Sequence, residues 1–472
     1  MEEAYRNTES CGDWQLSNKH FSSSAEVFLW LSEFINLESG HISQKPKSFR
    51  LDRMEILAEL AGHPERCAPS IHIAGSKGKG SVTAMIASIL EADGRWTARY
   101  MSPHIVDFRE RVSLGNTFFN EAVYCAAGDQ LRDIAECKVP AAHNSLFDPA
   151  AEEGESLTFF ELLTLYFFLC AQIGGCDVMV VETGMGGRLD CTNIVDPLVS
   201  VITLIELEHT AILGATIPAV AGEKAGIIKP GKPLILARQT AEALDVFTKR
   251  AAEKNSPLLY FPDIAAISDL HIHQGGTDFS LALYGKESYQ QLSIPIPGAV
   301  QAENAGLAAT ALKTAFPGIG EDAIRRGLEK VKIHARFEKI TGGIITADAP
   351  PLIIDGAHTP ESALLCAETF CSLYGEGGIL LFGCAADKNA GAMADILLPR
   401  FSQIIITTPG TFRSSNLEKA YRAFSSGKTL LIKDTRQAVE QTLKMSREKG
   451  LPILCTGSFY LVAEVRGCIF SI

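Results

Sequence analysis

Residues 71–83 read IHIAGSKGKGSVT, which is a short apolar run, a glycine-rich turn with a central lysine, and then the start of a helix. Glycines let the backbone N–H groups of such a turn point toward an anion, and the beginning of a helix adds a partial positive charge. Lys79 can reach the outer phosphates of a nucleotide, and the hydroxyl of Ser81 can hold Mg²⁺. The stretch therefore predicts a nucleoside triphosphate site between a strand and a helix.

The spacing of this turn differs from the usual P-loop pattern. Ile73 stands six positions before Lys79, where that pattern has a glycine. Taken alone, the stretch also fits an ordinary glycine-rich turn between a strand and a helix.

Composition narrows the class of protein. The chain has 472 residues, more than one hydrophobic core usually organises, so we expect two domains. A formal net charge of −12 without a long basic run argues against binding to nucleic acid or to an anionic membrane. The 12 cysteines include no Cys-x-x-Cys pair, which favours the reducing cytosol. The most apolar window, residues 159–173, is shorter than a membrane span and contains Glu161, so we expect a buried helix there.

Short apolar runs recur along the chain with helical stretches between them, which is typical of βαβ units and a mainly parallel sheet. Ligands of such sheets bind at the carboxyl ends of the strands. The run at residues 178–181 ends in Glu182, and the run at residues 199–204 is followed by Glu208 and His209. Both strand ends therefore carry potential metal ligands.

A second, smaller α/β unit is expected in the last third of the chain, where apolar runs occur at residues 352–354, 379–382, 404–406 and 453–455. The sequence SIPIPG at residues 293–298 suits an extended connection more than a sheet interior. We therefore expect a P-loop ATPase domain at residues 1–298 and a Rossmann-like α/β domain at residues 299–472. The active site is expected in the cleft between them, because closure over a triphosphate would exclude water from a reactive intermediate.

These features together resemble the Mur-ligase-like amide ligases and, within them, the dihydrofolate synthase/folylpolyglutamate synthase enzymes. The matching segments follow the family order through most of the chain, at residues 49–54, 72–81, 102–111, 157–161, 182–193, 209–214, 223–231, 304–305, 336–338, 355–360, 386–388 and 457–459. So many ordered matches are hard to produce by chance.

The resemblance implies an ATP-dependent ligase that adds L-glutamate to 7,8-dihydropteroate and to reduced folates. A carboxylate does not accept an amine directly at neutral pH because its oxygen is a poor leaving group, so the family first forms an acyl phosphate. Phosphoryl transfer depends above all on charge neutralisation and alignment. Whether the chain carries out one or both glutamylation reactions is left open by its residues. We expect small-molecule partners only and a monomeric protein in the cytosol.

The resemblance also assigns residues to roles. ATP would be held from both domains, by Gly78, Lys79, Gly80, Ser81, Asn304, Arg336 and Asp355. Magnesium would be held by Ser81, Ser102, Glu182 and His209, although a histidine is an unusual ligand for an ion that prefers oxygen donors. Catalytic roles fall to Lys79, Lys224 and His358. Read without the resemblance, Glu182 could equally cap a helix or form a salt bridge, and His209 could be satisfied within a loop.

Lys224 lies in the sequence Glu-Lys-Ala-Gly, and the resemblance implies that CO₂ carboxylates it to a carbamate. A lysine that loses its proton when partly buried is chemically competent for that modification. The alternative is a surface lysine in an ion pair on a helix.

The resemblance assigns binding of the pteroate or folate substrate to Thr158, Phe159, Phe160, Glu161, Leu189, Asp190 and Cys191. A flat pterin stacks on an aromatic face and donates hydrogen bonds to a carboxylate, which phenylalanine, glutamate and aspartate can supply. Alternatively, the two phenylalanines begin a buried helix, and one of them faces the core.

The chain departs from the family pattern at Lys77, Leu204, Glu206, Glu208 and Thr359, which leaves room for an altered substrate preference. Two other functions remain as alternatives: a Mur-type ligase that adds an amino acid to a cell-wall precursor, and a degenerate relative that only binds nucleotide. Residues 157–161 and 188–190 favour the folate branch. The joint presence of Lys79, Ser81, Glu182, His209 and Lys224 favours catalysis.

Overall fold

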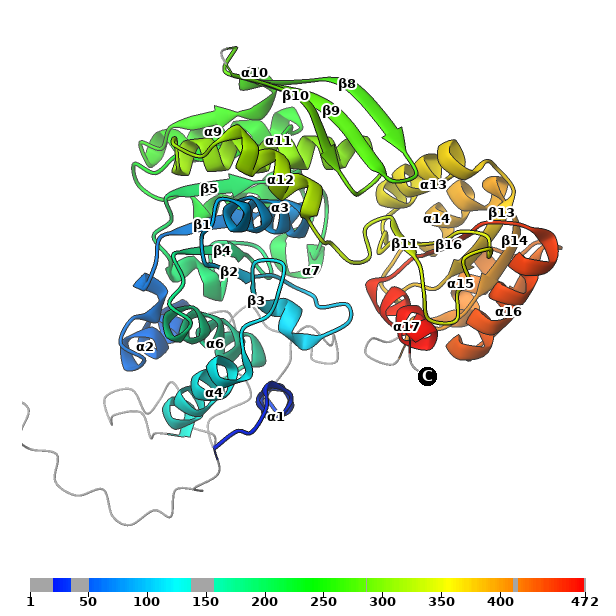
Figure 1. The fold of residues 1–472 in the computed structure, drawn as a ribbon, viewed down its shortest axis with the longest axis horizontal. Coiled ribbons are helices and arrows are strands. Elements are labelled where there is room, and N and C mark those ends of the chain that lie inside the picture. Colours follow the sequence, from blue (N-terminus) through cyan, green and yellow to red (C-terminus); the bar gives the residue numbers. More distant parts are fainter. Residues whose placement is uncertain (1–19, 35–50, 137–156, 286, 411–414, 471–472) are drawn as a thin grey trace, which may run out of the picture.

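The computed structural model describes residues 20–34, 51–136, 157–285, 287–410 and 415–470. Two α/β units lie side by side, and a small antiparallel sheet lies at the edge of the first unit (Figure 1). The expected fold class is confirmed, because each unit is built on a mainly parallel sheet.

The first unit is built on a seven-stranded sheet in the order β3-β2-β4-β1-β5-β6-β7, in which only β3 runs antiparallel to its neighbour. Its strands are β1 (Ser70–Ala74), β2 (Thr97–Tyr100), β3 (Val112–Leu114), β4 (Val178–Glu182), β5 (Val199–Ile202), β6 (Leu234–Leu236) and β7 (Leu258–Tyr260). The loops that contain many of the candidate site residues follow the carboxyl ends of β1 and of its two neighbours, β4 and β5. This sheet therefore positions the site.

Helices cover both faces of this sheet. They are α1 (Ser24–Leu31), α2 (Leu51–Leu60), α3 (Lys79–Ala92), α4 (Glu121–Glu136), α6 (Phe159–Ile173), α7 (Thr210–Leu213), α8 (Ile217–Lys224), α9 (Ala241–Glu253), α10 (Phe261–Ile264), α11 (Ala299–Ala315) and α12 (Glu321–Lys330). Alternate side chains of β4 enter the two cores: Val178 and Val180 pack with α3, α11 and α12, whereas Met179 and Val181 pack with α4 and α6. Burial on both faces explains why the strands read as continuous apolar runs.

Helix α6 covers the most apolar window of the sequence and is buried, as expected. Within the part of the chain that the structure describes, no helix combines the length and the apolar character needed to cross a membrane.

The domain boundary differs from the predicted position after residue 298. Helices α11 and α12 follow that position, yet their apolar residues complete the core beneath α3 and the first sheet. Ser88 of α3 donates a hydrogen bond to the carbonyl oxygen of Gly327 in α12 at 2.6 Å, and a Cβ at Gly327 would lie 2.3 Å from the Cα of Ile89. The proline-rich segment instead leads from β10 into α11, and the chain crosses to the second unit at residues 331–337.

The antiparallel sheet was not predicted. It consists of β8 (Ala265–His273), β9 (Gly276–Leu283) and β10 (Glu287–Ile294), and its β8–β9 hairpin reaches toward the second unit (Figure 1). At the hairpin tip, the side chain of Gln274 donates a hydrogen bond to the carbonyl oxygen of Leu373 at 3.1 Å. This contact joins the two units away from the linker.

The second unit has a six-stranded sheet in the order β11-β12-β16-β13-β14-β15, with β11 antiparallel. Its strands are β11 (Glu338–Ile340), β12 (Leu352–Ile354), β13 (Gly378–Phe382), β14 (Phe401–Ile406), β15 (Thr429–Leu431) and β16 (Ile453–Thr456). Its helices are α13 (Pro360–Tyr374), α14 (Ala390–Leu397), α15 (Leu417–Ala423), α16 (Thr435–Lys449) and α17 (Phe459–Phe470). The four expected strands of this unit are confirmed.

Candidate active site

The phosphate-loop candidate connects β1 to α3. Gly75 and Gly78 have φ angles of 145° and 90°, which favour glycine. A Cβ at Gly75 would lie 1.8 Å from Oγ1 of Thr203, and a Cβ at Gly78 would lie 2.7 Å from Oδ1 of Asn304. Gly78 caps α3 without a side chain, so the N–H groups of the first helical turn remain available to an anion.

Two lysines converge behind this loop. The ammonium groups of Lys79 and Lys224 both donate to the carbonyl oxygen of Gly75, at 2.8 and 2.7 Å, and Lys224 also pairs with Glu208 at 2.7 Å. The side chain of Lys224 is 1% exposed. Burial, together with the charge of Lys79, lowers the pKa of Lys224 to about 8, although Glu208 opposes this change. Burial also acts to raise the pKa of Glu208, but the two ammonium groups outweigh it and lower that pKa to about 2.

The oxygen atoms expected to hold Mg²⁺ are buried without partners. Among the described residues, Oγ of Ser81 and Oε2 of Glu182 have no hydrogen-bond partner, and their residues are 1% and 3% exposed. Burial raises the pKa of Glu182 to about 7, and the charge of Lys79 opposes the shift. Buried polar atoms in proteins are nearly always satisfied, and oxygen atoms are the ligands that Mg²⁺ prefers. This pair therefore fits a magnesium ion.

The other two expected ligands lie in the same cavity. Ser102 follows β2, and His209 precedes α7 with a φ of 47°. Burial lowers the pKa of His209 to about 4, so its ring is neutral at pH 7. The described residues contain no group of three or more histidine, cysteine, aspartate or glutamate side chains arranged around a common metal position. Magnesium would therefore take its remaining ligands from hydroxyl groups, phosphates or water.

The second unit supplies the opposite wall. The guanidinium of Arg336 lies 4.4 Å from the ring centre of Phe459. Ala335 and Phe337, on either side of Arg336, have φ angles of 57° and 44°. Asp355 fixes this turn, because its carboxylate accepts the backbone N–H of Phe337 at 2.7 Å. Asp355 therefore positions Arg336 in addition to any contact with ATP.

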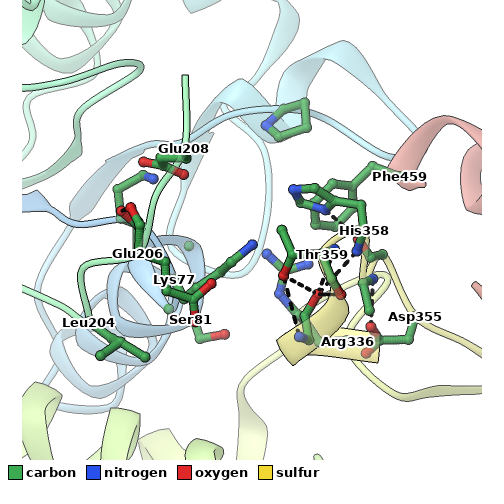
Figure 2. A pocket seen from close by; sticks show the side chains of 18 of the residues that line it. Lys77, Ser81, Leu204, Glu206, Glu208, Arg336, Asp355, His358, Thr359 and Phe459 are labelled. Carbon is green, nitrogen blue, oxygen red and sulfur yellow. Dashed lines mark hydrogen bonds between the residues drawn. The ribbon is translucent and has the colours of Figure 1, made fainter. Parts of the chain in front are cut away.

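His358 follows the same strand end as Asp355. Its Nδ1 lies 2.8 Å from the carbonyl oxygen of Gly356, which requires a proton on Nδ1 and leaves Nε2 as an acceptor. Burial, reinforced by the charge of Lys77, lowers the pKa of His358 to about 3. In Figure 2, His358, Arg336 and Phe459 lie across a gap from Lys77 and Ser81.

The expected pteroate residues separate into two groups. Phe159 is 5% exposed and packs in the core, whereas Phe160 lines the cavity against Gly184. The expected alternative, in which one of the two phenylalanines faces the core, therefore holds for Phe159, because the helix turns successive side chains about 100° apart. Leu189 and Cys191 line the cavity beside Phe160.

The two carboxylates expected to bind the pterin, those of Glu161 and Asp190, also stabilise the fold locally. Glu161 pairs with Arg53 at 2.9 Å, with both side chains at most 5% exposed, and it completes the cap of α6 with Thr158. Asp190 accepts the backbone N–H and the hydroxyl of Thr192 at 3.0 and 2.5 Å. Arg53 was not assigned a role from the sequence, although it lies within the first matching segment.

A cavity of about 750 Å³ joins these walls between the two units. Of the residues assigned to the site, those that line it are Gly78, Lys79, Gly80, Ser81, Ser102, Thr158, Phe160, Glu161, Glu182, Leu189, Asp190, Cys191, His209, Asn304, Arg336, Asp355 and His358. Lys224 lies behind the loop instead. The cavity also extends between the β8–β9 hairpin and α13, where Ile272 and Leu365 line it. No sequence signal pointed to these two residues, since their elements meet only in the folded chain.

Comparison with known proteins gives matches to two family models. The Mur ligase middle domain matches residues 138–312, and the Mur ligase glutamate ligase domain matches residues 335–459. The unmatched stretch between them, residues 313–334, contains α12 and the first part of the crossing between the two units.

Curated relatives match most of the chain. The dihydrofolate synthase/folylpolyglutamate synthase of Bacillus subtilis is 32% identical over 422 residues, covering 88% of this chain and 94% of the relative. The folylpolyglutamate synthase of Lacticaseibacillus casei is 32% identical, covering 88% and 93%.

Solved structures of folylpolyglutamate synthases also resemble this chain over nearly its full length. The Mycobacterium tuberculosis folylpolyglutamate synthase complexed with ADP has a TM-score of 0.82 at 27% identity, covering 96% of this chain and 99% of its own. An FPGS–AMPPCP–folate complex has a TM-score of 0.77 at 28% identity, covering 94% and 98%.

Proposed function

Because this chain belongs to the dihydrofolate synthase/folylpolyglutamate synthase family of Mur-type ligases, we propose that it uses ATP to join L-glutamate to 7,8-dihydropteroate and to reduced folates. The reaction activates the carboxylate of the pterin substrate as an acyl phosphate, which the amino group of glutamate then attacks. The named relatives favour this function over that of a cell-wall ligase, and the unpartnered oxygen atoms of Ser81 and Glu182 favour catalysis over a degenerate nucleotide-binding relative.

The observation that carries this proposal is the single cavity shared by the two units. It has the phosphate loop and the buried oxygen pair of Ser81 and Glu182 on one side, Phe160 and Cys191 on a second, and Arg336 and His358 on a third. The first wall would hold ATP and the second the pterin, and the third would take the amino acid while Arg336 reaches back to the triphosphate.

Charge neutralisation explains the role of the phosphate loop. The backbone N–H groups at the start of α3 and the ammonium of Lys79 would hold the triphosphate, and Arg336 would approach from the second unit. Ser81 and Glu182, with Ser102 and His209, would hold Mg²⁺, which when bound neutralises phosphate charge. Neutral His358 offers Nε2 as a hydrogen-bond acceptor to the incoming amino group.

Lys224 is proposed to carry a carbamate. Its pKa of about 8 gives a substantial neutral fraction near that pH, and only a neutral amine reacts with CO₂. The modification would replace the ammonium with an anion behind the phosphate loop. We also propose that the protein acts as a cytosolic monomer, which size-exclusion chromatography and cell fractionation would test.

The test is phosphate release from ATP and Mg²⁺ with L-glutamate, with the product identified by mass spectrometry. The carboxylate donor is 7,8-dihydropteroate, a reduced folate or a cell-wall nucleotide precursor. Glutamylated product from both pterins is the expected result. Product from only one pterin would restrict the activity to one reaction, and turnover with only the cell-wall precursor would overturn the proposal. ATP binding without turnover would favour the degenerate relative.

A further inference from the structure

Two charged residues outside the assigned site lie side by side at the cavity. Lys77 of the phosphate loop forms an isolated antiparallel bridge with Leu204, and the N–H groups of Ser76 and Lys77 donate to the carbonyl oxygen of Leu204 at 2.9 and 3.1 Å. The hydroxyl of Ser76 donates to the carbonyl oxygen of Glu206 at 2.9 Å. Both Lys77 and Glu206 line the cavity.

Among the residues that the structure describes, neither charge forms a salt bridge, although Lys77 and Glu206 lie close enough to shift the pKa values of one another. Both side chains are only partly exposed. A charged group that is partly removed from water and makes no salt bridge costs free energy. We therefore expect a ligand that carries both charges to bind between these two residues.

The side chain of Lys77 faces the second unit. In Figure 2, Lys77 extends into the space toward His358 and Thr359, and away from the hydroxyl of Ser81. Burial is the main cause that lowers the pKa of His358, and Lys77 is the next. Burial raises the pKa of Glu206, Lys77 opposes this, and Glu361 at the start of α13 adds to it. The two charges therefore lie where the second unit meets the phosphate loop.

Resting on the proposed function, we propose that Lys77 and Glu206 form the subsite for the head group of the incoming amino acid. Lys77 binds its α-carboxylate, and Glu206 binds its α-ammonium. A zwitterion satisfies both charges at once. A phosphate at this position would satisfy Lys77 but would be repelled by Glu206, which favours the amino acid as the occupant.

The test compares L-glutamate with 4-aminobutyrate, which lacks only the α-carboxylate. Steady-state kinetics are measured for the wild type, Lys77→Met and Glu206→Gln, with a folate and ATP saturating. Lys249→Met and Glu253→Gln on the exposed face of α9 serve as matched controls. Binding of an ATP analogue to each variant reports whether its phosphate loop remains folded.

We expect Lys77→Met to lower kcat/KM for L-glutamate by about 10- to 100-fold through KM, with the KM for ATP changed less than about twofold. The same variant leaves the value for 4-aminobutyrate unchanged, because that substrate has no carboxylate at this subsite. Glu206→Gln raises the KM for both amines, since both carry the ammonium.

Equal effects of Lys77→Met on both amines, or a rise in the KM for ATP instead, would overturn this subsite. If Glu206→Gln leaves the KM for both amines unchanged, Glu206 does not bind the ammonium group. These outcomes require product from the wild type. Failure of the wild type to glutamylate any pterin would refute the proposed function itself, and the subsite with it.

Discussion

At the scale of single residues, the carbonyl oxygen of Gly75 organises the base of the phosphate loop. It accepts the ammonium groups of Lys79 and Lys224, which brings two positive charges together behind the loop that would bind a triphosphate. Glu208 offsets part of that charge through its 2.7 Å pair with Lys224. Replacing the ammonium of Lys224 by a carbamate would remove the repulsion from Lys79, which links the proposed modification to the position of the loop.

The pair of Lys224 and Glu208 predicts a stability change that depends on pH. Lys224 has a pKa of about 8 in the folded chain against 10.5 as a free group, so the unfolded chain binds more protons between these values and stability rises with pH there. The pKa of Glu208 is about 2 against 4.5, so its stabilising contribution is lost as pH falls from 4.5 to 2. Glu208→Gln should lower the free energy of unfolding by about 2 kcal/mol at pH 7. The loss should shrink at pH 10, as Lys224 becomes neutral.

Urea unfolding at the two pH values measures this difference. Asp245→Asn, which breaks the exposed pair with Lys249, is the control and should cost less than about 0.5 kcal/mol at either pH. A loss for Glu208→Gln that is the same at pH 7 and pH 10 would mean that the charge of Lys224 is not its cause.

At the scale of elements, helix α3 carries a positive-φ glycine near each end, and only one of them faces the site. Gly78 has a φ of 90° and Gly94 has a φ of 84°. Alanine at either position should cost about 1 kcal/mol of stability, because the left-handed conformation is strained for residues with a Cβ. At Gly78 the new Cβ would also meet Asn304, whereas at Gly94 nothing lies within 4 Å.

Gly78→Ala should therefore weaken binding of an ATP analogue at least about 10-fold, whereas Gly94→Ala should leave it unchanged. Calorimetric titration of both variants measures the affinities, and thermal unfolding checks that their stabilities are similar. Equal affinities in the two variants would show that the phosphate loop tolerates a side chain at Gly78.

The same scale shows what a sequence can predict. Parallel strands such as β4 and β13 are buried on both faces, so their apolar runs are visible without knowledge of their neighbours. The phosphate loop is equally visible, because its glycines serve a local conformation. The side on which Phe159 and Phe160 lie depends on where α6 starts, and that start is set by Thr158 and Glu161.

At the scale of the whole molecule, the assigned site depends on residues far apart along the chain, such as Lys79 and Arg336, which are 257 positions apart. The resemblance to a family predicted that both would reach one cavity, which physical reasoning from local pattern alone could not. The domain boundary, in contrast, was misplaced because it was predicted from a local signal. A proline-rich segment is a local signal for a connection, whereas the membership of α11 and α12 in the first unit depends on packing against α3.

That packing predicts how the chain can be divided. A fragment ending at residue 334 retains α11 and α12, including Ala305, Ala308 and Leu328, which are at most 2% exposed in the first core. It should unfold cooperatively in urea and bind an ATP analogue more weakly than the full chain, because it lacks Arg336. A fragment ending at residue 298 exposes the apolar face of α3 and should bind a hydrophobic dye and show no cooperative transition. Equal stability of the two fragments would place the boundary at residue 298 after all, with α11 and α12 as dispensable additions to the first unit.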